Sequence, residues 1–276
     1  MLFPITNPVP CYGKDHPHPM GYGRWFGEGW KELCRRAREV GRATRPDMVF
    51  SAEEMCEIYI PYFETCLTRE ERRSKAIYDN EAMGTLSGKA PIFPYVYHDY
   101  MTGIGDFAEP CSLGDPRAPI AIAKQFARAK HIGVLIPNKA LETTGTTVKD
   151  AKFVLDAVNT LYELGASNTL LARMIKPPKI RALIPSGKPA AGPPVDWRTS
   201  RPALGAYESS NGVRALLLSN SGDQDVLVGI GPIGKGYRPI RLTINGQSTS
   251  VEGDGDGGFS KLTIPARSSI GIVYEK

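Results

Sequence analysis

Glutamate residues gather directly after a short apolar run at residues 47–51. The segment Ser-Ala-Glu-Glu-Met-Cys-Glu-Ile-Tyr at residues 51–59 contains Glu53 and Glu57. If the run is a strand of a parallel sheet, its carboxyl end faces the ligand crevice. Cleavage of a glycosidic bond uses two carboxyl groups, one to protonate the leaving oxygen and one as nucleophile or base. Glu53 and Glu57 are therefore candidate catalytic residues. The alternative is that one glutamate caps the next helical turn and the others are solvated.

A loop rich in histidine, proline and glycine covers residues 11–23 and contains His16 and His18. A His-x-His pair can ligate a metal from an extended segment, but no third nitrogen or sulfur ligand has suggestive spacing. The sequence therefore predicts no metal site here. Two alternatives stay open. The loop is either rigid and offers His16 and His18 to the hydroxyl groups of a substrate, or it is a purely structural Pro-His turn.

Aromatic and polar residues close a second apolar run at residues 91–97. The sequence Tyr-Val-Tyr-His-Asp-Tyr occupies residues 95–100. Aromatic rings stack on the apolar faces of sugars, and His98 and Asp99 can form hydrogen bonds with hydroxyl groups. Tyr97, His98 and Asp99 are therefore candidate substrate-binding residues. Packing of the tyrosines in the core or at an edge is the alternative.

Other catalytic schemes lack a sequence signature. The chain contains no Gly-x-Ser-x-Gly elbow, no Walker loop and no Rossmann fingerprint. Asp254 and Asp256 lack the full acidic loop of a calcium hand, so the segment around them is predicted to be a hairpin turn. A thiolate at Cys56 would be disfavoured by the neighbouring acids. No cofactor is predicted.

The first candidate residues depend on elements in the first hundred positions. Apolar residues at helical spacing predict a helix over about 24–41. Pro46 then leads into a buried strand at 47–51. The apolar run at 91–97 predicts a second strand.

Further along, helices and strands continue to alternate. Asp115-Pro116 has the chemistry of a helix start, and Gly133 is predicted to end that helix. Residues 134–136 predict a third strand, and residues 148–164 a long amphipathic helix. Short strands separated by helices favour a parallel sheet covered by helices.

The pattern changes after residue 195 to short β-branched runs separated by turn signals such as Asn245-Gly246. These runs predict an antiparallel β-sandwich over 195–276. The Pro- and Gly-rich stretch 178–194 is predicted to be a linker, and residues 1–177 form the preceding unit.

The composition limits the function classes. The 276 residues include 41% hydrophobic and 23% charged residues with a net charge of +5, which is typical of a globular protein. No apolar run approaches the roughly 18 residues that would span a membrane. Basic residues are spread along the chain, which argues against nucleic-acid binding. No basic region precedes Pro4 and Pro8, so no signal peptide is predicted and the cytoplasm is the default location.

The cysteines give no framework of their own. They number five, lie at irregular spacing and include no Cys-x-x-Cys pair. Neither a disulfide scaffold nor a zinc ribbon is predicted.

The order of the motifs resembles the later half of glycosyl-hydrolase-like TIM barrels. The resemblance rests on Pro-Cys-Tyr at 10–12, His-Pro-His-Pro at 16–19, the acidic segment at 51–59 and Phe-Pro-Tyr-Val-Tyr-His-Asp-Tyr at 93–100. The chain is similar to a bacterial family of unknown function that is related to α-galactosidase-type barrels and carries a β-sandwich after the barrel. Residues 171–178 are similar to the segment that joins the two.

This resemblance implies an acid/base carboxylate at Glu53 or Glu57 and a sugar pocket lined by His16, His18, Tyr97 and His98. It also implies an Asp nucleophile on an earlier strand, upstream of this chain. About three strand–helix units precede residue 177, whereas a closed barrel has eight. The expected fold is thus α/β plus all-β, a partial (β/α) TIM-type barrel followed by a β-sandwich. A homo-oligomer or a missing N-terminal half would complete the open sheet.

Three function hypotheses follow. The first is a glycoside-hydrolase-like protein that acts on O-glycosidic bonds, or descends from an enzyme that does, and is truncated and inactive in this form. The second is a non-catalytic carbohydrate-binding or assembly module. The third is a structural fragment without a ligand.

Overall fold

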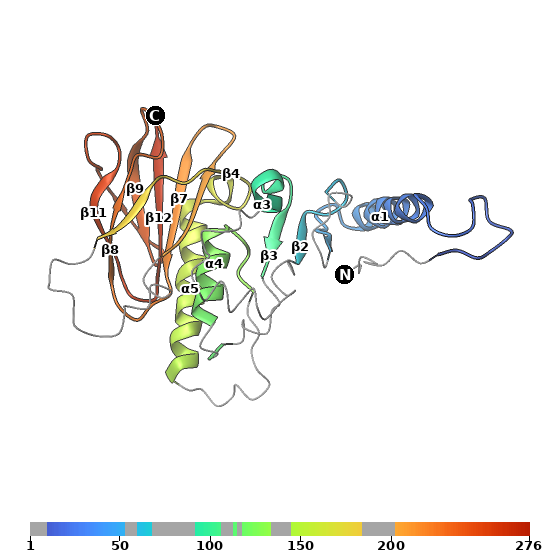
Figure 1. Ribbon diagram of the computed structural model, residues 1–276, viewed down its shortest axis with the longest axis horizontal. Coiled ribbons are helices and arrows are strands. Elements are labelled where there is room, and N and C mark those ends of the chain that lie inside the picture. Colours follow the sequence, from blue (N-terminus) through green and yellow to red (C-terminus); the bar gives the residue numbers. More distant parts are fainter. Residues whose placement is uncertain are drawn as a thin grey trace.

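The computed structural model describes residues 10–52, 60–67, 92–105, 113–114, 118–133, 145–183 and 202–276. The fold is mixed α/β, with helices and a small parallel sheet in the first part and two antiparallel sheets in the last (Figure 1). The described strands form no closed barrel. Within these ranges, no helix combines the length and the apolar character that a membrane span needs.

Helix α1 (Trp25–Thr44) confirms the helix expected over 24–41. Its apolar stripe buries Cys34 in a small core with Ala52, Phe63, Cys66 and Met101. The helix therefore packs on one face of the parallel sheet described next.

An acidic side chain ties α1 to this sheet. Glu64 accepts a hydrogen bond from the backbone N–H of Phe50 at 2.9 Å, and it forms ion pairs with Arg38 and with Arg42, the latter at 2.7 Å. These contacts hold the helix next to the segments that enter the first two strands.

The parallel sheet consists of β1 (Ser51–Ala52), β2 (Thr65–Leu67) and β3 (Thr102–Ile104), joined in chain order. A further parallel bridge joins Ile104 to His131 and continues that order. The strand expected at 47–51 is thus shorter and begins at its last residue. The strand expected at 134–136 lies outside the described residues.

The sequence predicted a strand over the apolar run at 91–97, and this prediction is wrong for the described residues 92–97. These residues form helix α3 (Ile92–Tyr97), and the strand follows it as β3. Pro94 explains the difference, because proline cannot donate to a sheet ladder but is accepted in the first turn of a helix, where the N–H has no helical partner. The backbone N–H groups of Tyr100 and Met101 then bond to the carbonyl of Tyr97 and turn the chain into β3.

Two further predicted helices are present. Helix α4 (Ala118–Ala127) ends six residues before Gly133 (133 − 127 = 6), because Ala129 adopts a positive φ of 45° and breaks the helix. Helix α5 (Gly145–Leu164) is followed by the short 3-10 helix η4 (Ala166–Asn168).

The C-terminal β unit comprises the strands within residues 173–183 and 202–276. Its first sheet has the order β10-β9-β12-β7-β6-β4 and its second the order β11-β8-β5, with antiparallel pairing throughout. The strands are β4 (Arg173–Ile175), β5 (Ile180–Leu183), β6 (Ala203–Glu208), β7 (Arg214–Asn220), β8 (Val226–Ile230), β9 (Arg238–Ile244), β10 (Gln247–Ser250), β11 (Phe259–Ile264) and β12 (Ser268–Glu275).

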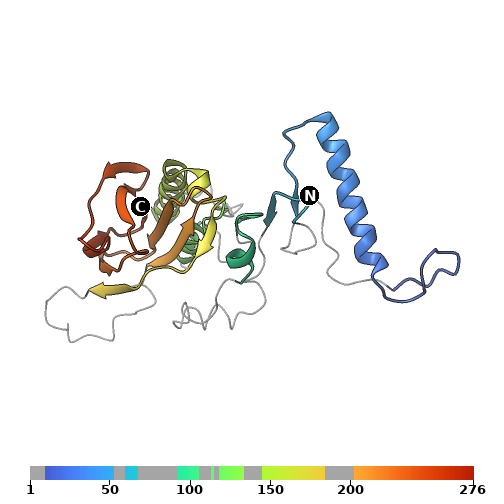
Figure 2. The ribbon, with the colours of Figure 1, turned by 90° about the horizontal axis from the view of Figure 1, so that it is seen from above.

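The six-stranded sheet is covered on both faces. On β7, Leu216 and Leu218 belong to the core shared with the second sheet, whereas Ala215 and Leu217 belong to the core under α4 and α5. Figure 2 shows these helices against the sheet. Burial on both faces explains why β7 is a continuous apolar run rather than an alternating one.

The antiparallel pairing begins earlier than the predicted boundary at 177. Strand β4 pairs with β6, and β5 pairs with β8, so the chain from Arg173 onward already belongs to the C-terminal β unit. Residues 184–201, which hold most of the predicted linker, lie outside the described ranges.

Candidate functional site

The predicted catalytic residues follow the end of β1. Ala52 is the last described residue of that strand, and Glu53 and Glu57 lie outside the described residues. The strand itself is parallel to β2 and β3, so the three carboxyl ends share one edge of the sheet. The sequence analysis predicted that the acidic segment 51–59 follows the carboxyl end of such a parallel strand.

One face of this sheet carries hydroxyl groups, which the sequence analysis did not predict. Ser51, Thr65 and Thr102 are register partners across β1, β2 and β3. Their neighbours Ala52 and Cys66 pack in the core with α1. Because successive side chains of a strand point to opposite faces, the hydroxyl row lies on the face away from α1.

Thr65 stands out within this row. Its Oγ1 atom is buried and has no hydrogen-bond partner among the described residues. A buried hydroxyl group without a partner costs free energy, which is why such groups are rare and tend to have a functional explanation. A ligand hydroxyl at this face could satisfy it. Serines and threonines at the start of each strand were the available sequence signal.

The predicted residues of α3 and the following turn separate into two groups. Tyr95 and Tyr100 are 52% and 66% exposed, and Asp99 is also exposed, so this group is accessible to solvent. Tyr97 is half-buried and makes contacts within the protein. An exposed aromatic ring beside a carboxylate can bind a sugar by stacking and hydrogen bonding.

His98 belongs to the interior. It is 3% exposed, with Nδ1 at 2.7 Å from the carbonyl oxygen of Ala172 and Nε2 at 3.1 Å from that of Arg128. Burial is the largest influence on this ring and lowers its pKa, although the neighbouring carbonyls act in the opposite direction. Both nitrogens face backbone carbonyls, so neither is free to bind a sugar hydroxyl as the sequence analysis expected.

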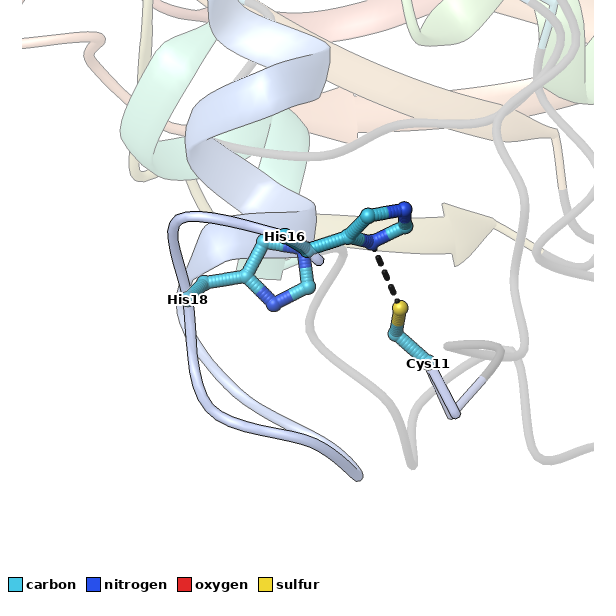
Figure 3. A group of neighbouring side chains, drawn as sticks. All are labelled: Cys11, His16 and His18. Atoms are coloured by element: carbon cyan, nitrogen blue, oxygen red, sulfur yellow. Dashed lines mark hydrogen bonds between the residues drawn. The ribbon is translucent and has the colours of Figure 1, made fainter. Parts of the chain in front are cut away.

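The loop before α1 brings three potential ligands together (Figure 3). Suitable atoms of Cys11, His16 and His18 all lie within 4.8 Å of one another, and Cys11 Sγ is 2.9 Å from His16 Nδ1. Cys11 and His18 are half-buried and His16 is exposed. The sequence analysis found no third ligand for the His-x-His pair, because it did not foresee that the loop would fold back on Cys11.

The predicted binding residues do not share one hollow. In both ribbon views the loop that carries His16 and His18 lies at the far end of α1, well away from α3 (Figures 1 and 2). The structure therefore brings the two histidines together and places the α3 group elsewhere.

The C-terminal β unit contains a groove of about 550 Å³. Its lining includes Asn168, Asn211, Arg241, Ser248 and Glu275. The Nε atom of Arg241 is buried without a partner in the described part of the chain. Val213, Ile240 and Val273 also line the groove, so it combines polar and apolar groups.

Asp254 and Asp256 lie in a turn, as predicted, but the turn does not close a hairpin, because the flanking strands β10 and β11 belong to different sheets. The backbone N–H of Asp254 bonds to the carbonyl of Gly258 at 2.8 Å, and the Asp256 carboxylate accepts from the N–H of Gly258 at 2.9 Å. Asp256 thus stabilises its own turn.

Comparisons with known proteins give a family model and distant structural neighbours. Residues 3–108 match the family described as "Domain of unknown function (DUF6259)". No protein of curated function matches the chain.

Structural neighbours of the chain are glycoside hydrolases. They include a GH30 endoxylanase from Clostridium papyrosolvens (10% identity, TM-score 0.42, covering 95% of this chain and 63% of that one). Another is α-galactosidase I from Mortierella vinacea (12% identity, TM-score 0.42, covering 91% of this chain and 63% of that one). A third is an α-amylase from H. orenii (12% identity, TM-score 0.47, covering 90% of this chain and 57% of that one).

The chain thus spans between about half and two thirds of the length of such structures. TM-scores below 0.5 do not establish a common fold.

Proposed function

We propose that the chain is a glycoside-hydrolase-like protein whose first part is a segment of a (β/α) barrel that binds carbohydrate at the carboxyl ends of its strands. The observation that carries this proposal is the strand order. β1, β2 and β3 are parallel and adjacent in chain order, and the Ile104–His131 bridge extends the series. Adjacent parallel strands in chain order are typical of (β/α) barrels, whereas doubly wound sheets reverse their order at a switch point.

In this proposal, the acids that follow β1 carry out the catalytic step. Glu53 or Glu57 would act as the acid/base carboxylate, since a carboxyl group at the carboxyl end of a barrel strand is in the position where such enzymes place catalytic residues. The hydroxyl row of Ser51, Thr65 and Thr102 would support the sugar on the same sheet. Tyr97 and Asp99 precede β3 and therefore lie at the amino edge of the parallel sheet, opposite to the acids after β1, so they are not part of this proposed site.

Hydrolysis is tested by release of nitrophenol from a panel of aryl glycosides, with galactosides first. We expect Glu53→Gln or Glu57→Gln to abolish release, and Glu54→Gln, an adjacent acid without an assigned role, to leave it unchanged. Release that persists in both Glu53→Gln and Glu57→Gln would remove these residues from the acid/base role.

A second candidate function is carbohydrate binding without hydrolysis, and the groove of the C-terminal β unit favours it. Amide, hydroxyl and guanidinium groups converge there, and the buried Nε of Arg241 lacks a partner in the described chain. Isothermal titration with galactosides separates the candidates. Binding that is weakened by Arg241→Gln but not by Lys261→Gln, on the second sheet, would favour the groove. No binding at millimolar sugar would overturn both candidates.

The proposed barrel segment needs a neighbour for its outer strands. Within the described part of the chain, the parallel sheet has outer edges whose backbone groups need another chain or segment as a partner. We therefore include a homo-oligomer, or a partner chain that supplies further barrel strands, in the proposal. Light scattering of the purified chain distinguishes an oligomer from a monomer.

A further inference from the structure

We propose that Cys11, His16 and His18 form a binding site for a divalent cation of the zinc class. The three ligand atoms already lie within 4.8 Å of one another, and Cys11 Sγ is 2.9 Å from His16 Nδ1. A tetrahedral zinc ion holds sulfur at about 2.3 Å and nitrogen at about 2.0–2.1 Å, so its neighbouring ligand atoms are roughly 3.3–3.6 Å apart. Small side-chain rotations convert the one arrangement into the other.

The backbone holds the loop closed around the cluster. Cys11 and Gly21 exchange two hydrogen bonds, from Cys11 N to Gly21 O at 3.0 Å and from Gly21 N to Cys11 O at 2.7 Å. Gly21 has a φ of 95°, which is the left-handed region that favours glycine. Pro17 and Pro19 flank His18 and restrict the backbone between the ligands.

His18 is oriented as a metal ligand commonly is. Its Nδ1 donates to the carbonyl of Pro19 at 3.1 Å, which leaves the lone pair on Nε2. Its ring stacks on Trp25, the first residue of α1, with centroids 4.2 Å apart and planes at 8°. A hydrogen bond from the second ring nitrogen and a packed ring fix the tautomer and the direction of a ligating histidine.

His16 is positioned by a glycine. A Cβ atom at residue 13 would lie 3.0 Å from Cε1 and Nε2 of the His16 ring. The absence of a side chain at Gly13 therefore allows this ring to approach the loop backbone and stay next to Cys11. A methyl group there would push the imidazole outward.

The donor set selects the metal. One thiolate and two imidazoles suit zinc, and cobalt as its spectroscopic substitute, whereas calcium and magnesium require oxygen ligands. Three protein ligands leave a fourth position for water, since His16 is exposed. Bound metal would tie the loop to the start of α1, independently of any carbohydrate chemistry.

The test uses the full chain, reduced with a phosphine and stripped with a chelator. Titration with Co²⁺ should give one tight equivalent, with a thiolate-to-cobalt charge-transfer band and the strong visible bands of tetrahedral cobalt. Zn²⁺ should displace it. Cys11→Ser should remove the charge-transfer band. His16→Ala and His18→Ala should each weaken Zn²⁺ binding by about 100-fold or more, beyond the usual effect of losing a group that only orients a ligand. Gly13→Ala should weaken it by about 10-fold or more.

His131→Ala is the matched control, because it removes an imidazole from outside the cluster, and it should leave the affinity unchanged. Far-ultraviolet circular dichroism of each variant separates a local loss of ligand from unfolding. A charge-transfer band that survives in Cys11→Ser, or equal affinity in the His16→Ala and His131→Ala variants, would overturn the proposal. So would the absence of stoichiometric Co²⁺ binding at micromolar concentration.

Discussion

His98 lies against Tyr207, with ring centroids 4.9 Å apart, and both side chains contact carbonyl groups at the end of α4. His98 Nε2 is 3.1 Å from the carbonyl oxygen of Arg128, and the Tyr207 hydroxyl donates to that of Ala127 at 2.8 Å. The last carbonyls of a helix have no helical partner. These two residues supply polar contacts there and join α3, α4 and the six-stranded sheet.

Removal of the His98 ring should therefore destabilise the protein. His98→Ala leaves a cavity and takes a hydrogen-bond donor away from buried carbonyls, which we expect to cost about 2–4 kcal/mol of unfolding free energy. Urea unfolding followed by circular dichroism measures the loss. His131→Ala, whose side chain is exposed, should change it by less than about 0.5 kcal/mol. Equal effects of the two substitutions would contradict this assignment.

Stability should also rise with pH because of His98. Burial lowers its pKa in the folded protein, so the unfolded chain binds more protons between the lowered pKa and the ordinary value near 6.5. The contribution is complete above about pH 6.5 and is lost as the pH falls towards the folded pKa.

Urea unfolding at a series of pH values from about 5 to about 8 tests this. His131 is exposed as a whole residue, but partial desolvation of its ring also lowers its pKa, so part of the slope belongs to that residue. We expect His98→Gln to show a smaller slope than the unsubstituted protein. Superimposable profiles would show that His98 does not titrate in this window.

Helices and strands were predicted correctly where burial of one face leaves a periodic pattern in the sequence, and less well where it does not. The helical spacing around Cys34 predicted α1, and the apolar run around Leu217 predicted β7, because each pattern records which face is buried. The run at 91–97 carries no such periodicity, and Pro94 decided its conformation. The partners of His98 lie far away in sequence, at Arg128 and Ala172, so no local pattern could show that the ring is enclosed.

The same limit applies to the candidate sites. A His-x-His pair is visible in the sequence, but its convergence with Cys11 depends on a loop closed by the hydrogen bonds to Gly21. The hydroxyl row likewise depends on the register of three strands, which sets Thr65 opposite Thr102. Register is a property of the folded sheet and not of any one strand.

Close packing between α4 and β6 gives another prediction. A Cβ atom at Gly205 would lie 1.7 Å from the carbonyl oxygen of Ala127, a backbone atom that cannot rotate away. Gly205→Ala should therefore destabilise the protein by about 3 kcal/mol or more, or prevent folding altogether.

Gly29→Ala is the matched control. Gly29 lies within α1 and has open space around it, so alanine should raise the stability by up to about 1 kcal/mol. Thermal unfolding of both variants checks the contrast. A Gly205→Ala protein as stable as the Gly29→Ala protein would be incompatible with the packing described.

Arg267 forms ion pairs with two acids, Asp150 and Asp223. We expect substitution of Asp150 to destabilise the protein more than substitution of Asp223. Asp150 is fully buried on α5 and accepts from Arg267 Nη1 at 3.1 Å and from the N–H of Gly114 at 3.0 Å. Asp223 binds the same guanidinium group at 3.0 Å, but it is 76% exposed.

Removing one partner of a buried ion pair costs about 3–5 kcal/mol, because the other charge loses its compensation. An exposed pair contributes about 0–1 kcal/mol. We therefore expect Asp150→Ala to lower the unfolding free energy several-fold more than Asp223→Ala in urea titrations. Comparable losses would mean that Arg267 draws equally on both acids.

Substitution of Thr65 should have opposite effects on protein stability and on sugar binding. Valine has nearly the same shape, and it removes a buried polar atom that has no partner among the described residues. Thr65→Val should therefore raise the unfolding free energy by about 1 kcal/mol. If the hydroxyl row contacts a sugar, the same substitution should weaken galactoside binding in isothermal titration, since the ligand loses a hydrogen bond. Thr102→Val removes a hydroxyl group from the same row, so it should also weaken sugar binding. A Thr65→Val protein that is less stable than the original would show that the Thr65 hydroxyl already has a partner within the fold, and the row would lose its claim to a ligand.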